Sequence, residues 1–293
     1  MTSVFTPHLV CRPALPKDTP EVIALTSLIW EGDDYVPYVW EDWLKDPQGL
    51  LAVAEFGGKI VGLCKLSQMA ARDWWMQGLR VHPDFQGRGI ASHLHDYVLD
   101  YWQRNGNGAV RLATSSIRLP VHHLCERTGF VKIGEYCLYT APVINEKNGD
   151  STWLAISDVS EALDYALQSP ATELTFGLMD LMWIMVTPNA EDLGDAIQRE
   201  RAWWWQRKTG LLVVIDDEDE VGPLPYIQLI ACPVERIPEI LQGYRRLASD
   251  LGFERAGWVA PLHPQLVPAL EAAGFQPAWD HPIFLFEKRH RTD

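Results

Sequence analysis

Two kinds of hydrophobic pattern follow each other along the first half of this chain. Alternating apolar positions predict β-strands, and apolar positions three or four residues apart predict helices. The predicted strands are residues 8–13, 51–56, 59–67, 74–81, 110–115 and 131–139, and the predicted helices are residues 19–29, 88–105 and 120–127. Gly57 and Gly58 separate two of these strands and give a strong hairpin signal. This order of elements predicts an α/β fold with a mixed, twisted sheet flanked by helices.

The second half of the chain repeats this succession in a diverged form. Strands are predicted at residues 153–156, 174–186, 211–215 and 226–232, and helices at residues 160–167, 190–205, 234–251 and 265–273. A polar, turn-rich segment, residues 145–151, separates the halves. The length of 293 residues suits about two domains. We place them at residues 1–145 and 151–293.

Two pairs of matching segments anchor the repeat. Gly129–Phe130 corresponds to Gly274–Phe275, and Leu79–Pro83 corresponds to Leu229–Pro233. The second copy is about five residues shorter between these anchors. The simplest explanation of this difference in length is that the second copy has lost residues from the turn that follows the strand ending at Pro83 in the first copy.

Three consecutive tryptophans, Trp203 to Trp205, fall at the end of the predicted helix 190–205. Three adjacent bulky rings on a helix cannot all face one core. We therefore expect at least one of them to be exposed or to pack against the first domain.

A glycine-bearing turn joins the predicted strand 74–81 to the helix that follows it. Pro83 ends the strand, and Gly87 and Gly89 remove side chains from the turn. Successive main-chain N–H groups and the start of a helix can then face an anion directly. Arg88 adds a positive charge. The segment is therefore predicted to bind phosphate.

The segment Gln86-Gly87-Arg88-Gly89-Ile90-Ala91 resembles the signature of the GNAT superfamily of acyl-CoA-dependent N-acyltransferases, Gln/Arg-x-x-Gly-x-Gly/Ala. In that family the signature follows a strand ending in Val-x-Pro, as in Val81-His82-Pro83. The resemblance implies two GNAT-like domains. It also implies that the main chain of residues 86–91 binds the pyrophosphate of acetyl-CoA, while Leu79 and Val81 pair with its pantetheine arm.

The second copy is expected to have lost this donor site. Val234–Pro238 carries no glycine, and Glu235 and Glu239 lie near where the pyrophosphate would be. Like charge at that place is unfavourable. We therefore expect a degenerate second domain without the cofactor.

Composition limits the partners of the protein. A formal net charge of −14 argues against nonspecific attraction to nucleic acid or to anionic membranes, and no apolar run is long enough to span a bilayer. The N-terminus lacks the basic and apolar regions of a signal peptide, so a cytoplasmic location is expected. The five cysteines show no metal-ligand spacing, so we expect free thiols and no metal. The oligomeric state, monomer or homodimer, stays open.

Candidate catalytic side chains follow from the resemblance and from residue chemistry. Many GNAT enzymes carry an asparagine and then a tyrosine, proposed as general acid, in the helix before Gly-Phe; here Arg118 and Cys125 occupy these positions. Cys125 can donate a proton, since a free thiol has a pKa of about 8.5, or serve as a small packing residue. His122 and His123 are alternatives because histidine titrates near neutral pH, and at most one of them is expected to face the cofactor. Gln77, on the expected substrate side, can orient an amine or a water but cannot accept a proton.

The segment after the first predicted helix mixes acidic and aromatic residues, and in the GNAT fold it lies over the acceptor site. Carboxylates beside aromatic rings suit an ammonium group. The candidate substrate contacts are Glu31, Asp34, Tyr35 and Trp40. The runs Asp34–Pro37 and Asp46–Pro47 also resemble histidine N-acetyltransferase relatives. An acidic surface loop with aromatic packing explains the same residues equally well.

These observations predict an N-acetyltransferase that moves an acetyl group from acetyl-CoA to the amine of a small molecule or amino acid. A non-catalytic acyl-CoA-binding or sensing module is one alternative, favoured by the missing tyrosine and by the lack of an evident carboxylate base. A protein or peptide N-acetyltransferase is another, favoured if an open groove lies near residues 34–43. The identity of the acceptor and the acyl-chain length do not follow from the sequence.

Overall fold

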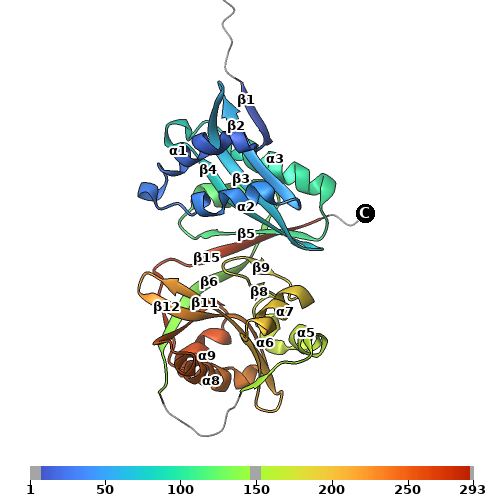
Figure 1. The fold of residues 1–293 in the computed structure, drawn as a ribbon, viewed down its shortest axis with the longest axis vertical. Helices are drawn as coiled ribbons and strands as arrows, with labels where there is room; N and C mark the ends of the chain where they lie inside the picture. Colours follow the sequence, from blue (N-terminus) through green and yellow to red (C-terminus); the bar gives the residue numbers. More distant parts are fainter. Residues whose placement is uncertain (1–7, 146–152, 291–293) are drawn as a thin grey trace, which may run out of the picture. The chain divides into compact units, whose positions relative to one another are not determined.

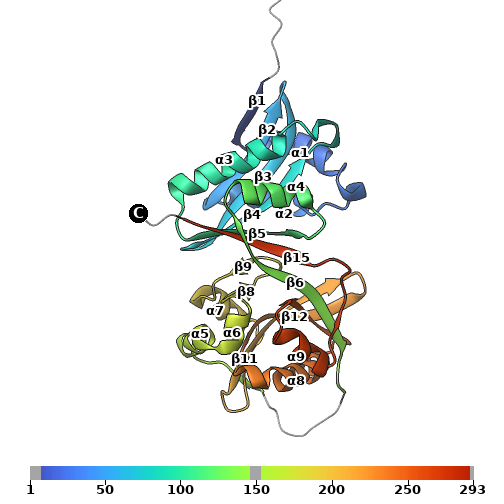
Figure 2. The ribbon, with the colours of Figure 1, turned by 180° about the vertical axis from the view of Figure 1, so that it is seen from behind.

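The computed structural model describes residues 8–145 and 153–290, which fall into two compact units (Figure 1). Of the described residues, unit 1 contains 8–112, 120–131 and 287–290, and unit 2 contains 113–119 and 132–286 apart from the gap. In each unit, helices cover a mixed sheet (Figures 1 and 2). The predicted α/β class is confirmed.

The strands of unit 1 follow the order β1-β2-β3-β4-β5, with the end of β15 beyond β5. Pairing is antiparallel from β1 to β4, and β4 and β5 are parallel. The elements are β1 (Leu9–Pro13), α1 (Thr19–Thr26), α2 (Val36–Lys45), β2 (Gly49–Phe56), β3 (Lys59–Ala70), β4 (Asp73–Val81), α3 (Ile90–Asn105), β5 (Ala109–Ser115) and α4 (Leu119–Arg127).

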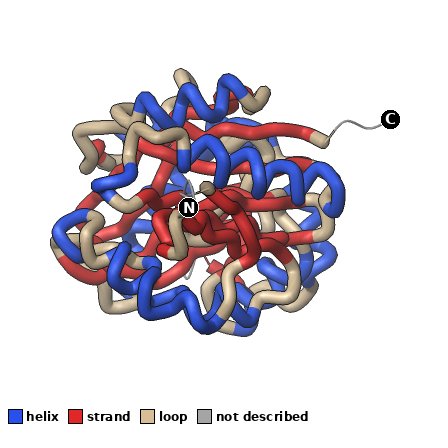
Figure 3. Tube along the Cα trace, turned by 90° about the horizontal axis from the view of Figure 1, so that it is seen from above, coloured by secondary structure: helices blue, strands red, loops and turns tan. Residues whose placement is uncertain are grey.

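Helices α1 and α2 cover one face of this sheet, and α3 and α4 cover the other (Figures 1 and 2). Seen from above, helices lie on both sides of the strands (Figure 3). Helix α2 falls in the segment expected to be a loop. Val36, Trp40 and Trp43 recur at helical spacing and are buried with α1 against β2 and β3, and Pro37 lies in the first turn of the helix. Burial of this apolar stripe makes the segment helical.

Unit 2 has the strand order β6-β13-β12-β11-β10-β7, with β15 beside β6. Helices α5 and α7 pack on one face of the sheet, and α8 and α9 pack on the other. The elements are β6 (Val131–Pro142), β7 (Trp153–Ala155), α5 (Val159–Gln168), α6 (Pro170–Leu174), β8 (Met179–Asp180), β9 (Met185–Val186), α7 (Ala190–Gln198), β10 (Ala202–Trp205), β11 (Gly210–Asp219), β12 (Gly222–Ala231), α8 (Ile237–Asp250), β13 (Arg255–Pro261), α9 (Leu266–Ala272), β14 (Gln276–Pro277) and β15 (Ile283–Arg289).

The helix predicted at 190–205 is wrong at its end. Helix α7 stops at Gln198, and the three tryptophans form strand β10, paired with β11. Side chains of a strand alternate between faces, so Trp204 packs with α5 and α7 while Trp203 and Trp205 pack on the side of α8. All three rings therefore pack within unit 2, and the expected contact with the first domain is not needed.

The strand predicted at 174–186 is also wrong. Helix α6 occupies its start, and a small two-stranded sheet, β8 with β9, occupies its end. Phe176, Met182 and Trp183 have positive φ values of 60°, 62° and 70°, which no continuous strand accommodates.

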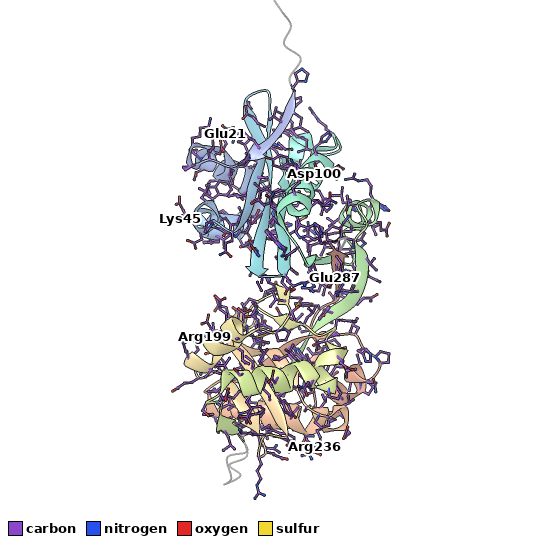
Figure 4. All side chains as sticks on the ribbon, turned by 90° about the vertical axis from the view of Figure 1, so that its right-hand side faces the viewer. Glu21, Lys45, Asp100, Arg199, Arg236 and Glu287 are labelled. Atoms are coloured by element: carbon purple, nitrogen blue, oxygen red, sulfur yellow. The ribbon has the colours of Figure 1, made fainter. Side chains whose placement is uncertain are left out.

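The last strands of the two halves are exchanged between the units. From Lys132 onward β6 belongs to unit 2, where it pairs with β13, whereas β15 from Glu287 onward belongs to unit 1. There Glu287 (Figure 4) accepts a hydrogen bond from Arg111 at 2.8 Å, and Arg111 also pairs with Asp73. The predicted linker 145–151 lies outside the described residues apart from Asn145. No helix in the described ranges is both long and apolar enough to cross a membrane.

Candidate active site

Strand β4 separates from its neighbour β5 partway along its length. Within the described strands, the two pair only from Asp73↔Ala109 to Trp75↔Arg111. Strand β4 continues to Val81 while still paired with β3. The edge of β4 from residue 76 to residue 81 is therefore free of β5, and an extended ligand can add to it as a strand would.

The main-chain groups of Leu79 and Val81 face this free edge. The N–H of His82 donates to the carbonyl of Val61 at 2.9 Å, so His82 faces β3. Successive residues of a strand direct their N–H and C=O groups to opposite sides. Val81 and Leu79 therefore point away from β3, as pairing with a pantetheine arm requires.

The turn after β4 leads into α3 without a side-chain cap. Gly87 and Gly89 have φ values of 73° and 77°, a left-handed conformation that other residues rarely adopt. A Cβ at Gly87 would meet no atom within 4 Å, so a ligand can approach the main chain there. Gly89 is the N-cap, and the first turn of α3 contains no acidic residue. The free N–H groups and the positive end of the helix dipole can therefore face an anion.

The side chains of the turn leave this main-chain surface accessible. Gln86 and Arg88 are exposed, and Arg88 lies over the ring of Phe85, 5.0 Å from its centroid. Ile90 is buried against the sheet, and Ala91 is half-buried. The turn thus offers amides and one exposed cation, which is the chemistry that a diphosphate needs.

On the α1–α2 side of the sheet, Asp34 is held by a partner that we did not predict. Its carboxylate is buried and accepts hydrogen bonds from Arg80 at 2.8 and 3.0 Å and from the N–H of Val36 at 3.2 Å. The Arg80 guanidinium also lies over the rings of Trp30 and Tyr35, at 4.3 and 5.3 Å. Asp34 therefore ties residues 30–36 to β4 and has little capacity left for a substrate. An arginine between the apolar residues Leu79 and Val81 was the available signal.

The other candidate substrate contacts divide into core and surface. Trp40 is buried, and its indole N–H donates to the hydroxyl of Thr19 at 2.9 Å, so it stabilises the α1–α2 pair. Glu31 is exposed and has a φ of 59°. Tyr35 is 40% exposed and meets the ring of Trp43 edge-on at 6.0 Å. Glu31 and Tyr35 are therefore the two that a substrate can reach.

A bulge in β4 lies next to these aromatic residues. The register of β4 against β3 shifts between Leu63 and Lys65, and Gly78 has a φ of 66°. A Cβ at Gly78 would lie 2.8 Å from the ring of Trp43. Only glycine lets β4 and α2 approach this closely.

Gln77 lies just before the bulge, opposite Lys65 on the neighbouring strand. Leu63, two residues before Lys65, packs with α1 and α2, so Gln77 faces that side of the sheet. Lys65 is buried and ion-paired with Asp46, and burial lowers its pKa. Gln77 is thus at the end of the β4–β5 pairing and on the face expected for the acceptor.

The candidate proton donors on α4 differ in burial. Cys125 is fully buried, and burial raises the pKa of its thiol to about 12. His123 is exposed, whereas His122 is 8% exposed and lies one turn before Cys125 on the same helix face. His122 therefore faces inward, on the same face of α4 as Cys125, which occupies the position of the family's tyrosine.

The corresponding turn of unit 2 has a different chemistry. Between β12 and α8 the described chain has no glycine, and Pro233 and Pro238 lack N–H donors. Glu239 lies in the first turn of α8, and its carboxylate pairs with Arg236 at 2.9 Å. An anion would meet a carboxylate here instead of free amides.

No group of three His, Cys, Asp or Glu side chains within residues 8–145 and 153–290 is arranged to hold a metal ion. The five cysteines, all within these ranges, are free thiols.

Comparison with known proteins agrees with this geometry. Residues 19–130 match the model of the acetyltransferase (GNAT) family. Probable N-acetyltransferase 16 of Homo sapiens is 29% identical over 96 residues, which are 32% of this chain and 26% of that protein. Histidine N-acetyltransferase of Xenopus tropicalis is 28% identical over 87 residues, 29% of this chain and 27% of that protein. The matches thus span about a quarter of either relative.

The fold of the whole chain is also found among solved structures. A tandem GNAT protein from the clavulanic acid biosynthesis pathway superposes with a TM-score of 0.56 over 98% of this chain and 100% of that chain, at 13% identity. The prediction of two GNAT-like domains is confirmed. Residues 19–130, which include the glycine turn and the divided β4–β5 edge, are thus similar to the acetyltransferase (GNAT) family, and the whole chain has the fold of a tandem GNAT protein.

Proposed function

We propose that this protein is an N-acetyltransferase that transfers the acetyl group of acetyl-CoA to the amine of a small molecule or amino acid. The observation that supports this most is the combination of the uncapped, glycine-bearing start of α3 with the free edge of β4. These two features lie next to each other in the chain, as a donor with a diphosphate and an extended arm requires. The similarity to a histidine N-acetyltransferase supports an amino-acid acceptor.

The residues of the turn fit acetyl-CoA, which would supply the activated thioester. The N–H groups of residues 86–91 would hold the diphosphate, with Arg88 adding charge. Leu79 and Val81 would hold the pantetheine arm through main-chain hydrogen bonds, and an N–H of the same strand would stabilise the charge that develops on the carbonyl oxygen. The bulge at Gly78 would let the chain present these groups beside the acceptor face.

On the acceptor side, Gln77 would orient the amine, and Glu31 and Tyr35 would contact the rest of the molecule. His122 would give a proton to the departing thiolate, since an imidazole placed beside a leaving group can act as a general acid. Cys125 is the weakest candidate, because a buried thiol of pKa about 12 gives up its proton poorly. The incoming amine would lose its proton to water, since the free carboxylate that a base would need is not offered by Asp34.

Release of coenzyme A thiol tests this proposal. The purified chain is mixed with acetyl-CoA and a panel of free amino acids and small amines, including histidine, and thiol is measured with a chromogenic disulfide. An N-acetyltransferase releases thiol only with an acceptor, and mass spectrometry finds the acetylated amine in equal amount. Tight binding of acetyl-CoA with no acceptor-dependent release across the panel and a peptide library would indicate a sensing module instead.

A peptide N-acetyltransferase would be distinguished in the same assay. If release depends on peptides with free N-termini and not on free amino acids, the small-molecule assignment is wrong while the acetyltransferase assignment stands. Gln77→Ala and His122→Asn would then still lower kcat, because they act on the transfer step rather than on acceptor recognition.

A further inference from the structure

Unit 2 contains a pocket that the acetyl-transfer site does not use. It has room for about one water-sized group, and it lies between the β8–β9 hairpin and strands β11, β12 and β13. Its polar lining consists of Asp180, Asp217, Tyr226 and Gln228. Trp183 forms part of its wall and stacks on Trp279, with ring centroids 4.7 Å apart.

The pocket lies at a bulge that corresponds to the one in the acetyl-transfer site. The register of β12 against β11 shifts between Val213 and Val214, which leaves Gln228 as the extra residue. In the alignment of Leu79–Pro83 with Leu229–Pro233, Gln228 takes the place of Gly78. Where unit 1 has a glycine covered by Trp43, unit 2 thus has a side chain directed into a pocket.

Gln228 has an acceptor that no described residue satisfies. Its side chain is 4% exposed, and its Oε1 accepts no hydrogen bond from any residue the structure describes. Leaving a buried carbonyl acceptor unpaired is unfavourable. Gln228 lines the pocket, so a hydrogen-bond donor that reaches its Oε1 would satisfy this acceptor.

The charges around the pocket favour a cation. Asp180 and Asp217 line it, and burial raises the pKa of Asp180 to about 7. Oδ1 of Asp180 accepts the N–H of Trp183 at 2.6 Å, which fixes the carboxylate in place. The nearby Arg255 is already paired with Asp219 at 2.6 Å. A positively charged donor would therefore find carboxylate, amide oxygen and aromatic carbon together.

We propose that this pocket of unit 2 binds the primary ammonium group of a small amine, with Asp180 and Gln228 as its acceptors and the Trp183 ring beside its carbon skeleton. An ammonium group is about the size of a water molecule and donates three hydrogen bonds. The site is separate from the proposed acetyl-transfer chemistry: unit 2 has lost the donor turn, so binding here involves no reaction.

Titration with benzylammonium chloride, followed by the indole ¹H–¹⁵N signal of Trp183 in the full chain, tests the proposal. Trp183→Phe assigns that signal. We expect a saturable shift of this signal. Benzyl alcohol has the same ring and no charge, so its affinity should be lower by about tenfold or more, as loss of one charge-assisted hydrogen bond predicts. The experiment contains no acyl-CoA, so its outcome is independent of the proposed function.

Two variants and a matched control locate the ammonium group. Asp180→Asn and Gln228→Leu should each weaken benzylammonium binding about tenfold. Glu218→Gln removes an exposed acid next to Asp217 in β11, on the opposite face of the strand, and should leave the affinity unchanged. If Asp180→Asn fails to fold by circular dichroism, Gln228→Leu supplies the test. The absence of a Trp183 shift, or equal affinity for the alcohol, would mean that the pocket holds an ordered water only, and would overturn the proposal.

Discussion

The two strand-to-helix turns of this protein, β4 to α3 in unit 1 and β12 to α8 in unit 2, differ in a few residues and therefore in chemistry. Both follow a strand with a bulge. Strand β4 pairs with the parallel strand β5 only at its start, whereas β12 pairs with the parallel strand β13 at Tyr226, in the middle of β12. Unit 1 continues into two left-handed glycines and an uncapped helix. Unit 2 continues into prolines and an acidic first turn.

This comparison separates what the fold provides from what the turn provides. Both units have the bulge, and in unit 2 a pocket lies beside it. Anion binding needs N–H donors and an absence of negative charge, which are local properties of the turn. The same fold can thus carry the local chemistry of a donor site in one unit and, in the other unit, only the pocket beside the bulge.

Replacing both turn glycines should have the largest effect. Gly87→Ala with Gly89→Ala forces side chains into a left-handed backbone and removes main-chain contacts to the diphosphate. We expect the Kd for acetyl-CoA to rise about 100-fold, the loss of roughly two charge-assisted hydrogen bonds. Calorimetry measures it.

Gly58→Ala is the matched control for this change. Gly58 has a φ of 82°, and a Cβ there would also meet nothing within 4 Å, but it lies in the β2–β3 turn. The backbone strain is about 1 kcal/mol for each replaced glycine, so stability should fall about half as much as in the double variant while the Kd stays unchanged. Equal loss of affinity in both proteins would mean that strain, not contact, explains the first result.

Breaking one ion pair in each unit compares how much such a pair contributes to the free energy of unfolding. Asp34→Ala leaves the buried Arg80 without its carboxylate, and should lower the free energy of unfolding by about 3–5 kcal/mol. Asp219→Ala breaks the Asp219–Arg255 pair of unit 2, whose side chains are 17% and 22% exposed, and should cost about 1 kcal/mol. Urea unfolding measures both. A larger loss for Asp219→Ala would show that the Arg80 pair does not hold the 30–36 segment as described.

The next variant tests whether Cys125 donates a proton or only packs in the core, as its counterpart in unit 2 does. The alignment of Gly129–Phe130 with Gly274–Phe275 pairs Cys125 with Leu270, and both are fully buried. Cys125→Ala should therefore reduce stability by about 1 kcal/mol and leave kcat close to its original value. His122→Asn should lower kcat about 100-fold. A 100-fold loss in Cys125→Ala would instead make the thiol the proton donor.

Opposite pKa shifts in the two units predict small, opposite pH effects on stability. Hydrogen bonds from Arg12 lower the pKa of Asp18 in unit 1, so this carboxylate stabilises the fold above its unfolded pKa and the contribution is lost as the pH falls below about 4. Burial raises the pKa of Asp180 in unit 2 to about 7, so stability falls as the pH rises from about 4 to about 7.

Asp180→Asn should therefore stabilise the protein more at pH 8 than at pH 4, while Asp18→Asn should destabilise it more at pH 7 than at pH 3. Thermal midpoints across this range show both trends. A pH-independent effect of Asp180→Asn would mean that the carboxylate ionises in the fold as freely as it does in water.

Local features of this fold could be predicted from the sequence. The order of strands and helices in the first half and the glycine turn depend on short patterns, because glycine and proline act on their own backbone. Helix α2 was missed although Val36, Trp40 and Trp43 show its spacing, since the acidic residues before it suggested a loop. Strand β10 was missed because a helical pattern was extended through residues that pair with β11.

Long-range features could not be predicted from such patterns. Asp34 and Arg80 are far apart in the sequence, so the position of Arg80 in a strand indicates a partly buried charge but does not identify Asp34 as its partner. The exchange of β6 and β15 depends on which sheet each strand finally joins. The bulges also appear only when the strands are paired, because a one-residue shift leaves the alternation of apolar residues nearly unchanged. The roles of Asp34 and Gln228 therefore depend on the structure.

Calorimetric titration of the full chain with acetyl-CoA tests the central claim most directly, because its stoichiometry counts the donor sites. The account predicts one molecule bound per chain, and none at the same concentrations when Gly87 and Gly89 are both replaced by alanine. Two molecules per chain, or one that survives this replacement in a folded protein, would contradict it.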